Sequence, residues 1–341
     1  MPLTFTMLTP DDTAGIDAAC GIMTAAAAVD APDTPPPSRG RLVELLTHPL
    51  PGQERVEHIL AYRDGVAVGL LVLVMPTLAN TDVCQVRITV PPELRRRGVG
   101  RALYHHAVTR TISDGRRRIA GSTVDRLSAA AGSAGFAEAL GAQPGLKVVN
   151  SRLSLDTVNE AALDAGLADA WPLAQGYSLV RWRDAVPERY LADLALLEAR
   201  LIEEAPVGDL DWKASEPDPQ RIRDIEAGLR RRNKAPFNVA MRHDATDRLV
   251  AWTALIGGGT YTWYFQQGIT LVLPEHRGRR LGLISKIENL RYAREHAPLR
   301  VVDTGNADVN EHMLAINTQL GFRPHAVEVI WQINLDDEPA A

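Results

Sequence analysis

Hydrophobic positions change their spacing along the chain, and these changes predict the secondary-structure elements. In the first half, helical spacing predicts helices over residues 9–28, with Thr9 as the N-cap, and over residues 39–47. The apolar runs 56–62 and 66–76 flank Arg63-Asp64-Gly65, a sequence typical of a β-hairpin. The remaining pattern predicts a strand over 81–90, a helix over 101–111, a strand over 118–122, a helix over 129–140 and a strand over 146–155.

The same order of elements returns in the second half. The pattern predicts a strand over 177–182, helices over 187–204 and 221–232, a hairpin of 238–243 with 249–255, a strand over 261–272, a helix over 281–295, a strand over 299–303, a helix over 309–320 and a strand over 326–335. This repetition predicts two domains, over residues 1–156 and 177–341, with a linker over 157–176. The expected fold class is α/β (α+β), with a mixed, mostly antiparallel sheet flanked by helices in each domain.

The composition excludes several classes of protein. Of the 341 residues, 45% are hydrophobic and 23% are charged, which excludes a mainly disordered chain. No apolar stretch reaches the roughly 18 residues that span a bilayer, and the N-terminus does not resemble a secretory signal, so we expect no membrane partner. Cys20 and Cys84 are too few for a disulfide framework or a cysteine-based zinc site, so we expect a cytoplasmic protein without a metal. The net charge of -5 argues against a nucleic-acid partner.

One segment has the features needed to bind a pyrophosphate. A strand that ends at Val90 is followed by a turn and the start of a helix, with the residues Arg95, Arg96, Arg97, Gly98, Val99, Gly100 and Arg101. Glycines allow a ligand to approach the backbone closely, and the unsatisfied amides of a first helical turn attract an anion. No Gly-Lys-Ser/Thr follows, so this is not a Walker loop. The strand belongs to a meander, so it is not a Rossmann fingerprint either.

A second copy of this loop follows Val272 and aligns with the first without gaps. Its residues are Arg277, Gly278, Arg279, Arg280, Leu281 and Gly282. Each copy follows the third strand of the same element order. Two matched copies favour anion binding over a chance match to a short motif.

These motifs resemble those of the GNAT N-acetyltransferase superfamily in its tandem, two-domain form. The phosphate loop of that family runs Arg/Gln-x-x-Gly-x-Gly/Ala after a strand that ends in valine. The first copy matches it completely, and the second has Arg280 in place of the first glycine. The family's later motif, an asparagine, a helix and Leu-Gly-Phe, matches Asn310 and Leu320-Gly321-Phe322, whereas the first half keeps only Leu140-Gly141. The resemblance covers nearly the whole chain and implies an acyl-CoA cosubstrate, usually acetyl-CoA, with transfer to an amine.

The resemblance also implies where the reaction takes place. A backbone amide near Val90 or Val272 would stabilise the oxyanion. The tyrosine that usually protonates the leaving thiolate is replaced by Asn317 in the second half and by Ala137 in the first. We expect Asn317 to hydrogen-bond the sulfur or the pantetheine arm. The glutamate that often acts as base on the motif strand is replaced by Val86 and Gly268.

Acidic residues after the long second-half helix are therefore candidates for proton removal. They are Glu203, Glu204, Asp209 and Asp211. The resemblance places this segment on the acceptor side, where carboxylates would hold a cationic amine. We take Glu204, Asp209 and Asn317 as the catalytic candidates. We expect His276 to assist the phosphate loop, and His243, His312 and Asp303 are further candidates for the base.

Two functions are consistent with these motifs. The first is an acyl-CoA-dependent N-acetyltransferase that transfers the acyl group to the amine of a small molecule by direct attack on the thioester. The alternative is a non-catalytic acyl-CoA-binding or scaffold protein built on degenerate acetyltransferase domains. We favour catalysis in the second half, because it keeps more polar residues around the reacting centre. The first half keeps a loop that would bind acyl-CoA.

Overall fold

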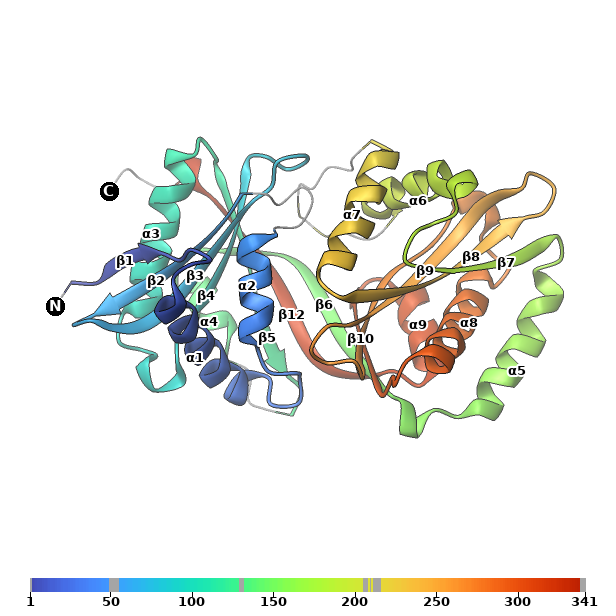
Figure 1. The fold of residues 1–341 in the computed structure, drawn as a ribbon, viewed down its shortest axis with the longest axis horizontal. Helices are drawn as coiled ribbons and strands as arrows, with labels where there is room; N and C mark the ends of the chain where they lie inside the picture. The colour runs from blue at the N-terminus through green and yellow to red at the C-terminus, as the bar shows by residue number, and fades with distance from the viewer. Residues whose placement is uncertain are drawn as a thin grey trace. The chain divides into compact units, whose positions relative to one another are not determined.

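The chain forms two compact units, each built on a mixed sheet. The computed structural model describes residues 2–48, 55–128, 132–204, 208, 210 and 216–337, except for the side chains of 202–204 and 337. Unit 1 comprises residues 1–146 and 328–341, and unit 2 comprises residues 147–327. Figure 1 shows the course of the chain through both.

Unit 1 contains a meander followed by a parallel strand. Its strands are β1 (Thr4–Met7), β2 (Arg55–Arg63), β3 (Val66–Met75), β4 (Val83–Thr89) and β5 (Arg118–Arg126). Its helices are α1 (Thr13–Asp30), α2 (Arg39–Thr47), α3 (Val99–Ser113) and α4 (Ala134–Glu138). The strands β1 to β4 pair antiparallel in sequence order, and β4 pairs parallel with β5.

Unit 2 repeats this arrangement. Its strands include β7 (Tyr177–Arg183), β8 (Lys234–His243), β9 (Arg248–Gly258), β10 (Tyr264–Val272) and β11 (Val301–Ala307). Its helices are α5 (Glu160–Ala170), α6 (Leu191–Glu204), α7 (Pro219–Arg231), α8 (Leu281–His296) and α9 (Glu311–Leu320). The strands β7 to β10 pair antiparallel, and β10 pairs parallel with β11. The predicted mixed, mostly antiparallel sheets are thus confirmed.

Helices cover both faces of each sheet. In unit 1 neighbouring residues of β3 face opposite cores, because side chains alternate along a strand. Leu70 packs with Ile16 of α1, whereas Leu71 packs with Leu103 of α3. In unit 2, α6 and α7 cover one face of the sheet, and α8 and α9 cover the other. Both units therefore have the same arrangement, a sheet between two helical layers, as Figure 1 shows.

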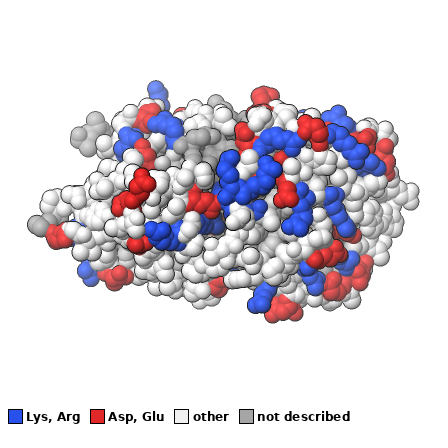
Figure 2. Space-filling view, in the orientation of Figure 1, with Lys and Arg blue, Asp and Glu red and all other residues white. Residues whose placement is uncertain are grey.

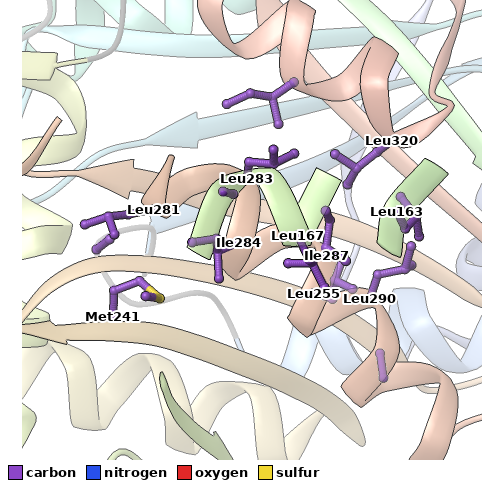
Figure 3. Close-up of a cluster of buried hydrophobic side chains, with 14 of the residues drawn as sticks. Leu163, Leu167, Met241, Leu255, Leu281, Leu283, Ile284, Ile287, Leu290 and Leu320 are labelled. Atoms are coloured by element: carbon purple, nitrogen blue, oxygen red, sulfur yellow. The ribbon is translucent and has the colours of Figure 1, made fainter. Parts of the chain in front are cut away.

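The first part of α8, residues 281–290, is almost entirely buried, because the helix is covered on two sides. Its inner face packs on the sheet, where Ile284 is buried in the same core as Met241 of β8. Its outer face meets α5, which contributes Leu163 and Leu167. Figure 3 shows these side chains in the same cluster. A helix buried all round is expected to lack polar residues, so any polar side chain on α8 calls for an explanation.

The two units exchange their terminal strands. The strand β6 (Gln143–Ser154) crosses from unit 1 into unit 2, where residues 148–154 pair antiparallel with β11. The strand β12 (Arg323–Asn334) crosses in the other direction, so residues 328–334 complete unit 1 beside β5. These compact units divide the chain differently from the predicted domains 1–156 and 177–341. The predicted linker, residues 157–176, contains α5, whose Leu163 is buried in unit 2.

Several predicted elements differ from the structure in extent. The first helix is capped by Asp12 and not by Thr9, since the Asp12 side chain accepts a hydrogen bond from the Gly15 amide at 2.9 Å. The strand β1 and the helix α5 were not predicted. The helix predicted over 129–140 is shorter in the structure, where α4 spans Ala134–Glu138, and residues 129–131 of the prediction lie outside the described residues. The hairpin at Asp64-Gly65 is confirmed, with both residues at positive φ.

Charged side chains are distributed with both signs on the face seen in Figure 2. Basic side chains gather over α7, and acidic ones lie beside them. Arg221 pairs with Glu198 at 3.0 Å, and Arg223 pairs with Glu188. Within the part of the chain that the structure describes, no helix is both long and apolar enough to cross a membrane.

The exchange of strands predicts that a residue near the end of the sequence stabilises unit 1. Trp331 is buried, packs with Ala137 and Ala142, and donates a hydrogen bond to Thr123 at 2.8 Å. Trp331→Ala should cost about 3 kcal/mol through the cavity it leaves. Hydrogen exchange should then accelerate in β5 and stay unchanged in β8.

The matched control is Trp182→Ala, because Trp182 is equally buried but lies in unit 2. This variant should accelerate exchange in β8 and leave β5 protected. Faster exchange in β8 from the Trp331 variant would contradict the assignment of β12 to unit 1.

Candidate functional site

The candidate site lies where two parallel strands of unit 2 separate. β10 and β11 pair from Tyr264–Val301 to Gln266–Asp303 and then part. Each strand keeps a partner on its other side, β9 for β10 and β6 for β11, so its backbone remains hydrogen-bonded. The separation opens the sheet without breaking its outer ladders.

A cavity of about 240 Å³ occupies this opening. It is lined by residues 267–270 of β10, residues 304–307 of β11, Asn310, Met313, Lys286 of α8 and Leu201 of α6. Its volume lies below the range of about 300–1,000 Å³ that is typical of complete small-molecule sites. The cavity therefore suits the reacting end of a ligand and not a whole cofactor.

β10 contains a β-bulge beside this cavity. Between the pairs Gln267–Leu255 and Thr270–Thr253, the residues Gly268 and Ile269 lie opposite the single residue Ala254 of β9. A bulge leaves one residue unpaired and re-aims its peptide groups. Both bulge residues line the cavity, so the irregular backbone faces the space where a ligand would react.

The side chain of Gln267 supports the bulge. Its Nε2 donates to the Ala254 carbonyl at 2.8 Å and to Thr253 Oγ1 at 3.0 Å. A backbone amide of a regular strand would normally satisfy a carbonyl such as that of Ala254. Gln267 replaces that amide, which stabilises the bulge.

An ion pair fixes the point at which the strands part. Arg152 of β6 donates to both carboxylate oxygens of Asp303, at 2.6 and 2.7 Å. Tyr264 of β10 donates its hydroxyl to the same carboxylate at 2.6 Å. Burial, together with this hydrogen bond to Asp303, raises the pKa of Tyr264. Asp303, a candidate base in the sequence, is thus committed to holding three strands together.

The two phosphate loops share one backbone path. Arg95 Nε donates to the Val90 carbonyl at 3.1 Å, and Arg277 Nε donates to the Val272 carbonyl at 3.2 Å. Each arginine therefore closes the turn that carries the loop.

Each loop also has two residues at positive φ. They are Arg96 (59°) and Gly98 (81°) in the first loop, and Gly278 (77°) and Arg280 (58°) in the second. Glycine and arginine have exchanged places, and a left-handed arginine costs about 1 kcal/mol in either loop. Arg280 therefore keeps the path of the loop.

Both loops fit an anionic group. Arg96, Arg97 and Gly98 are exposed before α3, and the residues from Arg277 to Arg280 are exposed before α8. The first-turn amides of Val99, Gly100 and Arg101, and of Leu281 and Gly282, have no partner within their helices. Exposed arginines beside such amides are suited to a pyrophosphate.

His276 is held at the edge of the second loop. Its Nδ1 lies 2.8 Å from the Tyr177 hydroxyl, and its ring lies 5.1 Å from the ring of His243. Burial and the neighbouring His243 lower the pKa of His276, so the ring stays neutral at pH 7. His276 thus braces the loop and adds no charge to it.

Lys286 is the least expected residue of the site. Its side chain is 2% exposed, and burial lowers its pKa from 10.5 to about 7. Its Nζ lies 5.4 Å above the centre of the Phe322 ring, and no acidic side chain in the described part of the chain pairs with it. The sequence offered one weak signal for it, a lysine that lies, with its neighbour Ser285, directly between the apolar residues Ile284 and Ile287.

Asn317 lies behind the cavity and not on its surface. The side chain is buried, and its Nδ2 donates to Asn306 Oδ1 at 2.7 Å. Asn306 and Asn310 line the cavity, and Asn310 also caps α9 through the Met313 amide at 3.2 Å. Asn306, which the sequence did not single out, thus stands between Asn317 and a ligand.

The other candidates are distributed unevenly. Glu203 and Glu204 end α6, but their side chains lie outside the described residues, as do Asp209 and Asp211. Leu201 brings the end of α6 to the cavity wall. His312 is exposed on α9. The described residues contain no group of three or more His, Cys, Asp or Glu placed to hold a metal ion.

Unit 1 differs at the positions that make this site polar. The offset of 182 residues between the loops (277 against 95) matches Lys286 with Tyr104, which is buried with Ile119 and Leu335. β4 pairs with β3 without a register shift, so unit 1 lacks the bulge. The first parallel pairs, at Val83 and Tyr264, are 181 residues apart, so the bulge accounts for the one extra residue before the second loop.

The burial of Lys286 predicts an unusual dependence of stability on pH. Between about pH 7 and 10 the unfolded chain binds a proton that the folded chain does not. The free energy of unfolding should therefore rise with pH in this window. Lys286→Met should remove this slope and raise the free energy of unfolding at pH 7 by about 2 kcal/mol. Denaturant titrations at pH 7 and 9.5 measure both effects.

Lys147→Met provides the control, because Lys147 is exposed and lies 3.6 Å from Asp308. It should keep the slope of the unmodified chain. Equal slopes for the unmodified chain and the Lys286 variant would contradict the lowered pKa.

Comparisons with known proteins agree with this architecture. The model of the acetyltransferase (GNAT) family matches residues 28–141. A tandem GNAT protein from the clavulanic acid biosynthesis pathway is 30% identical over the whole of both chains, with a TM-score of 0.82. A GCN5-related N-acetyltransferase from Sphaerobacter thermophilus is 18% identical over 99% of this chain and 97% of its own, with a TM-score of 0.65.

A more distant likeness concerns the fold alone. The N-myristoyltransferase of Saccharomyces cerevisiae is 10% identical over 98% of this chain and 81% of its own, with a TM-score of 0.59. No curated protein sequence matches the chain. The family model, the full-length likeness at 30% identity and the repeated loops together show that the chain belongs to the GNAT acetyltransferase family and carries two GNAT domains in tandem.

Proposed function

We propose that unit 2 transfers an acyl group from an acyl-CoA, with acetyl-CoA as the first candidate, to the amine of a small molecule. The observation that carries the proposal is the bulge at Gly268 and Ile269, placed in a polar cavity beside an intact anion-binding loop. Family members are N-acyltransferases that use acetyl-CoA or another acyl-CoA. The bulge and the loop supply the two features that this reaction requires from the backbone.

The loop before α8 would hold the pyrophosphate of the donor. The amides of Leu281 and Gly282 point out of the helix end, and Arg279 and Arg280 are exposed beside them. Beyond Gln266 and Asp303, the facing edges of β10 and β11 are not paired with each other. The pantetheine arm would bind to these edges. This path leads from the loop to the cavity.

The bulge would stabilise the oxyanion. When an amine attacks the thioester, the C–S bond breaks, an amide forms, and negative charge develops on the carbonyl oxygen. A backbone N–H that is held rigidly and directed at this oxygen lowers the barrier and typically raises the rate by about 10²–10³-fold. Gln267 holds the bulge from behind through the Ala254 carbonyl, so the donor needs no rearrangement during the reaction.

Residues on the acceptor side would receive the proton and orient the groups. Leu201 places the end of α6 at the cavity, which supports Glu204 and Asp209 as candidates for accepting the proton of the amine. Asn317 would act through Asn306, whose Oδ1 it holds, and so position the polar group nearest the leaving sulfur. In this scheme Asn317 is a positioning residue.

Unit 1 would bind an acyl-CoA without turning it over. It keeps the loop, but Val86, Ile88, Tyr104 and Ile119 form an apolar cluster where unit 2 is polar. The alternative reading, a scaffold that binds acyl-CoA in both units and catalyses in neither, predicts no thiol release from any amine. The two readings are therefore separated by one assay.

Matched substitutions in the two loops test the proposal. Gly278 and Gly98 both have positive φ, and a Cβ at either position meets no atom within 4 Å. Valine at either site strains the loop by about 1–2 kcal/mol without a steric clash elsewhere. Gly278→Val should abolish thiol release from acetyl-CoA across a panel of amines, whereas Gly98→Val should leave the rate within twofold.

Binding stoichiometry provides the second readout. Each variant should lose one of two acetyl-CoA sites in calorimetry while its thermal unfolding shows the other unit intact. Equal loss of turnover in both variants would disprove the assignment to unit 2. Binding without thiol release from any amine in the unmodified chain would overturn the enzyme proposal.

A further inference from the structure

Lys286 is a buried amine that pairs with no acidic side chain among the described residues. The side chain is 2% exposed and lies on a helix whose other buried positions are mostly apolar. An ammonium group removed from water is costly unless a counter-charge accompanies it. Among the described residues its one close polarisable neighbour is the Phe322 ring, at 5.4 Å, which is a weak substitute for a carboxylate.

The part of the cavity lining that the structure describes offers no such counter-charge to Lys286. The described residues that line it include no aspartate and no glutamate, and Lys286 is the one titratable side chain among them. The other polar side chains in the described lining are neutral, namely those of Gln267, Thr270, Thr304, Asn306 and Asn310. Asp303 directly precedes the lining residue Thr304, but its carboxylate is already bound by Arg152 and Tyr264.

The lack of a counter-charge among the described residues bears on which ligand the cavity binds. A lysine in this place lowers stability, whereas Tyr104, at the equivalent position of unit 1, packs into an apolar cluster. The position thus accepts an apolar or aromatic side chain. A lysine that lowers stability inside a binding cavity points to a ligand that interacts favourably with its amine.

We propose that Lys286 receives a carboxylate of a bound substrate at the inner wall of the unit 2 cavity, so that this site selects an anionic substrate. The inference rests on the proposed function and adds to it the chemical class of the substrate. A carboxylate at Lys286 would form a charge-assisted hydrogen bond in a water-poor setting, which is among the stronger polar contacts in proteins. The pyrophosphate is a poor candidate for this counter-charge, because its loop is exposed at the start of α8 whereas Lys286 is buried.

The carboxylate can come from either reactant. It can terminate the acyl group of the donor, as in a succinyl group, or it can belong to the acceptor, as in an amino acid. Both sources share the same recognition chemistry, and the experiment has one arm for each.

The donor arm uses stable thioether analogues of acyl-CoA. Calorimetry on the full chain compares S-(3-carboxypropyl)-CoA with its neutral amide, S-(3-carbamoylpropyl)-CoA, and the heat that Gly278→Val removes is assigned to unit 2. The carboxylate analogue should bind about tenfold more tightly than the amide, and Lys286→Met should abolish this preference. Lys147→Met, which removes an exposed lysine, should retain it.

The acceptor arm uses the same variants. N-acetylalanine and N-acetylalaninamide are titrated in the presence of CoA. If the carboxylate belongs to the acceptor, N-acetylalanine binds about tenfold more tightly than the amide, and Lys286→Met removes the difference. A Lys286-dependent preference in either arm supports the proposal and identifies the source.

One result would overturn it: Lys286→Met leaves the ratio of carboxylate to amide affinity unchanged in both arms, whether or not it weakens binding of all the probes. Failure of the proposed function looks different, because it would show as intact binding without thiol release. Thermal unfolding of Lys286→Met, expected at or above the temperature of the unmodified chain, confirms that the variant is folded.

Discussion

Parallel strands cannot admit a ligand between them unless they stop pairing, and the place where β10 and β11 stop is fixed by one carboxylate. Asp303 accepts two hydrogen bonds from Arg152 and one from Tyr264, so a single group ties β11 to the strands on both sides. Before this point the strands are paired, and beyond it they part around the cavity. One ligand could contact the loop, the bulge and Lys286 together only because this opening exists. Asp303 is therefore a structural residue of the site, although its position in the sequence suggested a base.

The two units show how little separates a polar reaction site from an apolar one. They share the loop path, the paired arginine contacts at Val90 and Val272 and the parting of the parallel strands. Two of their differences are one inserted residue in β10 and the exchange of Tyr104 for Lys286. The insertion changes the direction of peptide groups, and the exchange changes the charge behind them. Neither change alters the fold. Gln267 hydrogen-bonds the Ala254 carbonyl opposite the bulge, and the Lys286 side chain borders the cavity.

Local patterns predicted most of the helices and strands, and they failed where long-range packing decides. The Asp64-Gly65 turn and the Gly321 helix end follow from backbone preferences that the sequence states directly. β1 has only four residues and pairs with β2. Four residues are too few to show the alternation of apolar and polar positions that identifies a strand. α5 was taken for a linker because its burial depends on α8, which lies far along the chain. The loops were predictable because glycine and arginine at fixed spacing have few other uses. The bulge, Asn306 and the burial of Lys286 were not, because each depends on which strand lies opposite.

The exchange of β6 and β12 has a consequence for the order of events in the cell. Ribosomes release a chain from its N-terminus, and domains generally fold as units in that order. Unit 1 cannot follow this rule, since the strand segment that completes its sheet, residues 328–334, is made only after residues 147–327 of unit 2. Its edge at β5 stays unpaired throughout the synthesis of unit 2. The first unit to be translated is therefore the last to be finished, and an exposed strand edge must be tolerated until then.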